Sequence, residues 1–202
     1  MQPLQAGDSA PFFFLKTPYD VEVALAKRLL EGSVALEFVR GSWDPDTRER
    51  LDQLAGARET VERLEARLLV VACERSETLA GYLDKHPSPL TLLVDSTREV
   101  SRSYGILRRF SFPVPNIARP STFVIDRCGF VRYAYVSRLS IHAAPLEEIY
   151  QALRELQNAS GRGEDVSRRD AETQRRNGDG DGDGDGDGDG DGDGDGEQRR
   201  GS

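Results

Sequence analysis

The fold is decided by one stretch, Phe38-Val39-Arg40-Gly41-Ser42-Trp43-Asp44-Pro45-Asp46-Thr47-Arg48, because it joins a buried strand to a long helix. Upstream, residues 33–39 are mostly apolar, as expected of an interior strand covered on both faces. Downstream, apolar residues recur at spacings of three and four, which predicts a helix over 45–67: Leu51, Leu54, Ala57, Val61, Leu64 and Leu68. Asp44 and Pro45 suit the N-cap and the first helical position. The stretch therefore predicts a strand, a turn and a helix that starts beside Asp44.

The segments on both sides extend this unit into a sheet protein. Before it, short strands over 12–15 and 21–23 predict a hairpin, followed by a helix over 24–30. After it, strands over 68–73 and 90–95 alternate with helices over 76–84 and 97–104, and 108–118 reads as an irregular loop. A second hairpin over 121–136 and a helix over 145–156 complete the pattern. We predict an α/β fold with a central mixed β-sheet flanked by helices and an N-terminal β-hairpin extension.

Composition divides the chain into two parts of different character. Residues 1–157 hold 72 of the 75 hydrophobic residues, and their 20 basic and 21 acidic residues nearly balance. Residues 158–202 hold 7 basic and 14 acidic residues, and glycine and aspartate alternate over 178–196. Such a tract buries nothing and repels itself. We predict a folded domain over 1–157 and a disordered, Gly-Asp-rich acidic tail over 158–202. A calcium-binding repeat is disfavoured, because the tract lacks the apolar residues that wind a β-helix.

The charge balance, the longest apolar run and the cysteine and histidine counts exclude several classes of protein. The near-neutral domain lacks the basic footprint of a nucleic-acid-binding protein. The longest wholly apolar run, residues 68–73, is far shorter than the roughly 20 residues that span a bilayer. Two cysteines, Cys73 and Cys128, cannot build a disulfide scaffold, and His86 and His142 give no metal-ligand spacing. No secretory signal is visible. We expect a cytoplasmic protein with no metal, cofactor, nucleic-acid or membrane partner.

Four motifs in order make the chain resemble a known family: Gly7-Asp8-Ser9-Ala10-Pro11, then Phe38–Trp43, then Tyr104-Gly105-Ile106, then Arg119–Gly129, which reads RPSTFVIDRCG. The set resembles the peroxiredoxin-like redoxins of the alkyl hydroperoxide reductase/thiol-specific antioxidant group, in the thioredoxin superfamily. The resemblance covers residues 3 to 156 and implies a thioredoxin-like fold.

The resemblance fails at two positions of the active-site motif. The family pattern is similar to F-x-R-G-x-W-C-P-x-C-R, in which the first cysteine attacks peroxide or a disulfide and the second resolves the product. Here Asp44 stands at the nucleophile position and Thr47 at the resolving position. A helix N-terminus stabilises a thiolate or a carboxylate equally. Asp44 thus keeps the negative charge but has no sulfur that could be oxidised and recycled.

The rest of the active-site frame is inferred from the same resemblance: Arg40, Trp43, Pro45, Arg48, Arg119 and Pro120. Pro120 stands where thioredoxin-like folds place a cis-proline facing the active-site turn. Any of the three arginines could neutralise Asp44, and Trp43 is expected to pack rather than bind substrate. Cys73 should end a strand at the same sheet edge, so it is a candidate thiol, although free cysteine also packs well in interiors. Asp44 and Asp46 lack the Lys and Mg²⁺ ligands of a phosphotransfer pair.

Two functions of different class remain open from the sequence. One is a redoxin-fold protein that has lost peroxidase catalysis and acts as a binding or regulatory module for an unidentified protein or small molecule. The other is an active thiol-dependent antioxidant oxidoreductase that uses Cys73 or a partner's thiol. A homodimer is compatible with both. The missing thiols at positions 44 and 47 favour the first function.

Overall fold

The computed structural model describes residues 2–108, 117–138 and 143–159. These belong to one compact unit, Met1–Arg162. Its strands are β1 (Phe14–Lys16), β2 (Glu22–Ala24), β3 (Ser33–Val39), β4 (Ala66–Ala72), β5 (Thr91–Val94), β6 (Leu107–Arg108), β7 (Ile117–Ala118), β8 (Ser121–Ile125) and β9 (Val131–Val136). Its helices are α1 (Leu25–Glu31), α2 (Pro45–Arg63), α3 (Ser76–Leu83) and α4 (Glu99–Ser103), with a further helix over 146–159.

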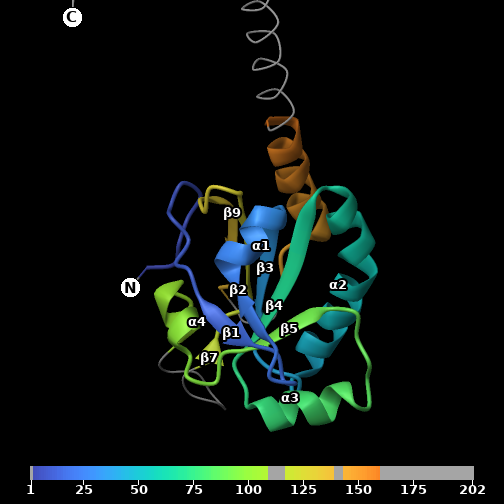
Figure 1. Cartoon of the computed structure of the whole chain (residues 1–202). Helices are drawn as coiled ribbons and strands as arrows, with labels where there is room; N and C mark the ends of the chain where they lie inside the picture. Colours follow the sequence, from blue (N-terminus) through green and yellow to red (C-terminus); the bar gives the residue numbers. More distant parts are fainter. Residues whose placement is uncertain (1, 109–116, 139–142, 160–202) are drawn as a thin grey trace, which may run out of the picture. The chain divides into compact units, whose positions relative to one another are not determined.

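Seven strands form one mixed sheet in the order β2-β1-β5-β4-β3-β8-β9 (Figure 1). Strands β3, β4 and β5 are parallel, and β8 and β9 continue the sheet antiparallel. At the other side β1 pairs antiparallel with β5 and with β2. The predicted α/β fold, its mixed sheet and its N-terminal hairpin are therefore confirmed.

Helices cover both faces of the sheet because β3 and β4 bury side chains on both faces. One core packs Val34, Leu36 and Phe38 of β3 against helices α1 and α4. The second packs Ala35 and Val39 of β3 against α2, α3 and the helix over 146–159. The alternation of side chains along β3 assigns its one charged residue, Glu37, to the face that α2 covers.

The four motifs that carried the resemblance meet in the first core. Phe38, Tyr104 and Phe123 form an aromatic cluster with ring centroids 5.1 to 6.0 Å apart. The Tyr104 hydroxyl donates to the Pro11 carbonyl at 3.1 Å. Burial raises the pKa of Tyr104, which keeps that hydroxyl protonated as a donor. Segments far apart in the sequence thus share one packing unit, which explains why they occur together.

The structure corrects some of the predicted boundaries. Helix α2 ends at Arg63 rather than at 67, and Glu65 takes a left-handed conformation (φ 54°) before β4 starts. At the two ends of the stretch expected to be irregular, 108–118, the structure has β6 and β7, which pair antiparallel. The last helix, predicted to end at 156, continues to residue 159, so the first two residues of the predicted tail over 158–202, Asn158 and Ala159, are helical. The rest of that tail, from residue 160 on, the prolines at 113 and 115, and His142 lie outside the described residues. Within the described ranges, no helix is long and apolar enough to cross a membrane.

Candidate functional site

A tight turn joins the carboxyl end of β3 to the start of α2. Gly41 has φ 152°, a conformation that strains residues with a Cβ atom, and a Cβ atom there would lie 2.5 Å from Nε1 of Trp43. The Asp44 amide donates to the Gly41 carbonyl at 3.1 Å. Asp44 itself is the N-cap of α2, with Pro45 as the first helical residue. The predicted start of the helix is confirmed.

The Asp44 carboxylate is buried and paired, with 5% of the residue exposed. Oδ2 accepts a hydrogen bond from the Thr47 hydroxyl at 2.9 Å, and Oδ1 lies 3.3 Å from Nη1 of Arg40. No backbone amide of α2 donates to this side chain, although an N-cap aspartate was expected to accept one. The Thr47 hydroxyl and the Arg40 guanidinium bind its two oxygens instead. Residues 44 and 47, where the resemblance implies cysteines, therefore bond to each other through oxygen.

Ser42 and Glu74 lock the turn onto the neighbouring strand. The Ser42 amide donates to Oε1 of Glu74 at 2.8 Å, and its hydroxyl donates to Oε2 at 2.9 Å. Both residues are buried. Arg48 holds the same residue from α2, because its Nε donates to the Ser42 carbonyl at 2.7 Å. Its guanidinium also lies 5.7 Å from the ring centroid of Tyr82. The Arg48 amide donates to the Asp44 carbonyl at 3.2 Å, whereas the Asp44 carboxylate forms its ion pair with Arg40.

Trp43 is less buried than expected. Its exposed fraction is 39%, and the Arg40 guanidinium lies 5.1 Å from its ring centroid. Nε of Arg40 is buried without a hydrogen-bond partner within the described ranges. Arg40 therefore stands between an aromatic face and the Asp44 carboxylate, and Trp43 offers part of its surface to solvent beside them.

A buried ion pair supports the first turns of α2. Arg50 donates from Nε to Oε1 of Glu37 at 2.8 Å and from Nη2 to Oε2 at 3.3 Å. The Thr122 hydroxyl donates to Oε2 of the same carboxylate at 2.6 Å. Glu37 is 1% exposed and Arg50 is 6% exposed. The pair ties α2 to β3, and through Thr122 to β8.

Cys73 lies at the same edge of the sheet as the turn, because it follows β4 and the last residues of β3 and β4 are in register. However, it is 6% exposed and packs in the core. Its Sγ lies 3.0 Å from the Ser101 hydroxyl, which itself donates to Asp95 at 2.7 Å. Burial raises the pKa of the Cys73 thiol to about 11. This thiol is a poor nucleophile at neutral pH, since attack requires the thiolate.

Arg119 and Pro120 lie at the start of β8, next to the end of β3, since Ser121 pairs with Phe38. The Arg119 guanidinium donates to the Gly105 carbonyl at 3.4 Å, and burial lowers its pKa. Of the three arginines considered for Asp44, Arg40 is the one paired with it. The structure thus places Arg40, Trp43 and Asp44 in the turn before α2 and Pro45, Thr47 and Arg48 in the first turn of that helix. Arg119, Pro120 and Cys73 lie just outside the neighbouring ends of β8 and β4.

Cys128 lies at the other end of the sheet, in the turn between the antiparallel strands β8 and β9. It is exposed, and the two cysteines are not bonded to each other. Among the described side chains, no group of three or more His, Cys, Asp or Glu could hold a metal ion. The turn at Asp44 has charge, hydrogen-bond donors and an aromatic surface, so it can bind a ligand, but it has no sulfur atom that could pass through a sulfenic acid.

The site lies where a strand passes into a helix at the carboxyl edge of a mixed sheet, inside a chain that carries four matching motifs. A sequence profile of the AhpC/TSA family matches residues 6–134. The chain belongs to the AhpC/TSA family. No curated protein sequence matches it significantly.

Solved structures share the fold of this AhpC/TSA-family chain. The crystal structure of peroxidoxin BcpB from Mycobacterium tuberculosis aligns with a TM-score of 0.67 and 20% identity, over 76% of this chain and 98% of that one. A peroxiredoxin-like protein from Aquifex aeolicus aligns with a TM-score of 0.68 and 18% identity, over 77% and 90%. The reduced 2-Cys peroxiredoxin of Plasmodium vivax aligns with a TM-score of 0.67 and 22% identity, over 80% and 86%.

Sequence reasoning missed the partners that fix the turn, Glu74 and the Glu37–Arg50 pair. Glu74 comes just after a buried parallel strand, and such positions gather at one sheet edge with the turn. Glu37 is a lone charge in an otherwise apolar strand, and a buried charge requires a partner. Both signals were present in the sequence. The choice of Arg50 over the other basic residues of α2 required the structure.

Proposed function

We propose that this AhpC/TSA-family protein does not catalyse thiol-dependent peroxide reduction and instead acts as a binding or regulatory module. Its family membership and redoxin fold supply the scaffold. The observation that carries the proposal is the start of α2, where the Asp44 carboxylate, held by Arg40 and Thr47, occupies the place that the family pattern gives to a thiolate. A carboxylate cannot form the sulfenic acid on which thiol peroxidase turnover depends.

The remaining sulfur atoms support the same proposal. Cys73 is buried in the core with a raised pKa, and Cys128 lies in a turn at the far end of the sheet. An active oxidoreductase that uses Cys73 is the alternative, favoured only by the position of Cys73 after β4. It would require the core to open around Sγ, since the thiol is 6% exposed. A partner's thiol is the other route to activity.

Binding at the turn is supported by what remains exposed there. Trp43 presents part of its indole, and the adjacent Arg40 carries a positive charge that Asp44 balances. A surface that combines an aromatic ring and a cation with fixed backbone suits a protein or small-molecule ligand. The turn is fixed before any ligand arrives, because Glu74 and Arg48 hold Ser42 from both sides.

The test is peroxide consumption by the full chain with dithiothreitol or a thioredoxin system as reductant. We expect the wild-type rate to equal the rate of the reductant alone. The matched variants are Cys73→Ser and Cys128→Ser, which each remove one thiol and should change nothing. Robust wild-type turnover that is lost in Cys73→Ser would overturn the proposal and establish the alternative.

A further inference from the structure

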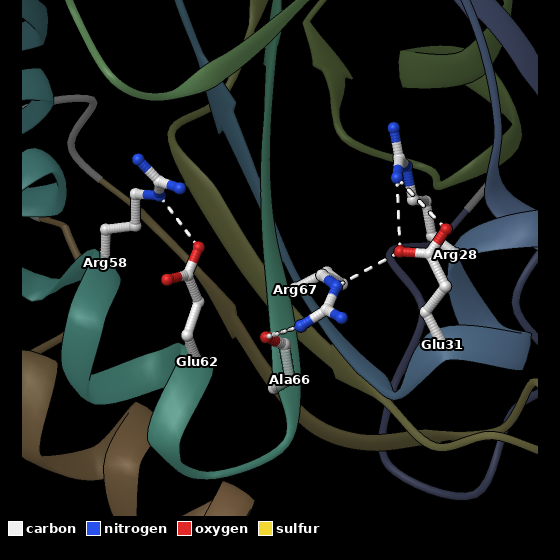
Figure 2. A network of polar contacts seen from close by, with 6 residues as sticks. All are labelled: Arg28, Glu31, Arg58, Glu62, Ala66 and Arg67. Carbon is white, nitrogen blue, oxygen red and sulfur yellow. Dashed lines mark hydrogen bonds and ion pairs between the residues drawn. The ribbon is translucent and has the colours of Figure 1, made fainter.

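A small pocket at the amino end of β4 gathers three arginines from three elements of the fold. It has a volume of about 200 Å³, and its charged lining consists of Arg28 of α1, Arg58 and Glu62 of α2, and Arg67 of β4. Apolar residues and one hydroxyl complete the wall: Leu68, Leu69, Pro89, Leu90 and Thr91. Figure 2 shows Arg67 between Arg58 on one side and Arg28 on the other.

The pocket is separate from the turn at Asp44. Strands β3 and β4 are parallel, and the turn follows the carboxyl end of β3, whereas Arg67 is the second residue of β4. The two features therefore lie at opposite ends of the same pair of strands. A ligand in this pocket would not contact the residues on which the proposed function depends.

Positive charge exceeds negative charge at this pocket. The lining holds three guanidinium groups and one carboxylate, that of Glu62. A second carboxylate, Glu31, accepts from Nη1 of Arg28 at 3.1 and 3.2 Å and from Nε of Arg67 at 3.1 Å (Figure 2). Those two arginines lower the pKa of Glu31, with the hydrogen bond from Arg67 as the largest cause. With both carboxylates counted, one positive charge remains uncompensated.

Hydrogen-bond donors also remain on the three arginines. Arg58 uses only Nε, which donates to Oε1 of Glu62 at 2.8 Å, so both of its Nη groups lack an acceptor in the part of the chain that the structure describes. Arg67 uses Nε and Nη1, the latter donating to the Ala66 carbonyl at 3.5 Å, which leaves its Nη2. Planar guanidinium forks of this kind match the oxygen geometry of phosphate and hold it through charge-assisted bonds.

We infer that this pocket binds a compact phosphate group, either free or carried by a small organic body. The guanidinium donors would bind the oxygens, and the apolar wall with the Thr91 hydroxyl leaves room for a short organic substituent. The Glu62 carboxylate competes with the ligand, because it shares the lining and occupies Nε of Arg58. Removing that carboxylate therefore strengthens binding, which a merely structural ion pair would not predict.

The test is isothermal titration calorimetry of the full chain at constant ionic strength with two probes, inorganic phosphate and glycerol 3-phosphate, and with acetate as a control anion. We expect saturable one-to-one binding of a phosphate probe with Kd below about 10 mM, and none of acetate. Tighter binding of glycerol 3-phosphate would assign the site to a phosphate monoester. Equal or weaker binding would assign it to the free anion.

Three variants locate the site. Arg58→Gln should weaken binding about tenfold, the effect of one lost charge-assisted bond. Glu62→Gln should tighten it severalfold. Arg154→Gln is the matched control, since Arg154 forms an ion pair with Glu147 at 2.7 Å and is not part of the pocket lining. The inference is overturned if the wild type shows no saturable binding up to about 20 mM. It is also overturned if Arg154→Gln weakens binding as much as Arg58→Gln, or if Glu62→Gln fails to tighten it.

Discussion

Replacing Arg50 with methionine tests whether the buried ion pair fastens α2 to the sheet. The substitution keeps an unbranched side chain of similar length but removes both bonds to Glu37, at 2.8 and 3.3 Å. The Glu37 side chain is 2% exposed, so its charge stays buried with the Thr122 hydroxyl as its remaining donor. Removing one member of a buried ion pair lowers the free energy of unfolding by about 3–5 kcal/mol, because the other charge stays buried without its partner. Because the Thr122 hydroxyl still donates to Glu37, we expect Arg50→Met to lower the free energy of unfolding by about 3 kcal/mol.

The assay is urea unfolding followed by circular dichroism, supported by thermal melting. A loss of about 3 kcal/mol corresponds to a fall in Tm of about 6–12 °C for a domain of this size. The double variant Glu37→Met/Arg50→Met removes both charges and should recover at least about half of the loss. Arg154→Met is the control: Arg154 and Glu147 side chains are 49% and 73% exposed, and such pairs contribute at most about 1 kcal/mol.

Two results would refute this reasoning about α2. A loss below about 1.5 kcal/mol in Arg50→Met would mean that the Glu37 charge finds other compensation. A double variant as unstable as the single one would mean that Arg50 acts through its packing and not through its charge.

Three further predictions concern sulfur chemistry and the chain's end. At pH 8 an alkylating reagent should modify the exposed Cys128 and spare Cys73 until urea is added. Because the pKa of Cys73 in the folded protein, about 11, lies above the free value of about 8.5, the free energy of unfolding should fall as the pH rises through this range, by up to about 2–3 kcal/mol more in wild type than in Cys73→Ala. The double variant Asp44→Cys/Thr47→Cys, treated with oxidised glutathione as the electron acceptor, should form an internal disulfide that dithiothreitol reduces, detected by mass spectrometry as the loss of two hydrogen atoms. Two thiols that persist under this treatment would count against it. Truncation after Ala159, which removes two of the three apolar residues beyond 157, should leave Tm unchanged, and a fall of more than about 5 °C would contradict the predicted division of the chain.

The sequence predicted an element correctly where its hydrophobic pattern matched only one type of secondary structure. Strand β3 was predicted with its observed bounds, because the mostly apolar run between Gly32 and Arg40 is short and rich in β-branched and aromatic residues, which favours a buried strand. The end of α2 was misplaced because Leu64 and Leu68 continue the helical spacing across the chain reversal at Glu65. The side chain of Leu68 in fact packs from β4, and periodicity alone does not distinguish the two. Strands β6 and β7 have two residues each, too few to show a period.

At the candidate site, the sequence predicted which residues start α2, but it did not predict which side chains form hydrogen bonds and ion pairs with them. Asp44 and Pro45 identified the start of α2, because their backbone preferences are local. The choice of Arg40 as the partner of Asp44 depends on the turn geometry that Gly41 permits and on the Trp43 ring beneath the guanidinium. That geometry comes from tertiary packing around Ser42 and Glu74, which no spacing rule contains.

The central claim is that the start of α2 is a thiolate site that holds a carboxylate. The most direct test is the thiol pKa of Asp44→Cys, measured from the pH dependence of alkylation in a Cys128→Ser background, where Cys73 stays unreactive. The new sulfur would lie at the helix N-terminus beside the Arg40 guanidinium, and both favour the thiolate. We predict a pKa clearly below the free value of about 8.5. A value at or above about 8.5 would contradict the claim and leave the chain with the fold of its family but without the family's thiolate site.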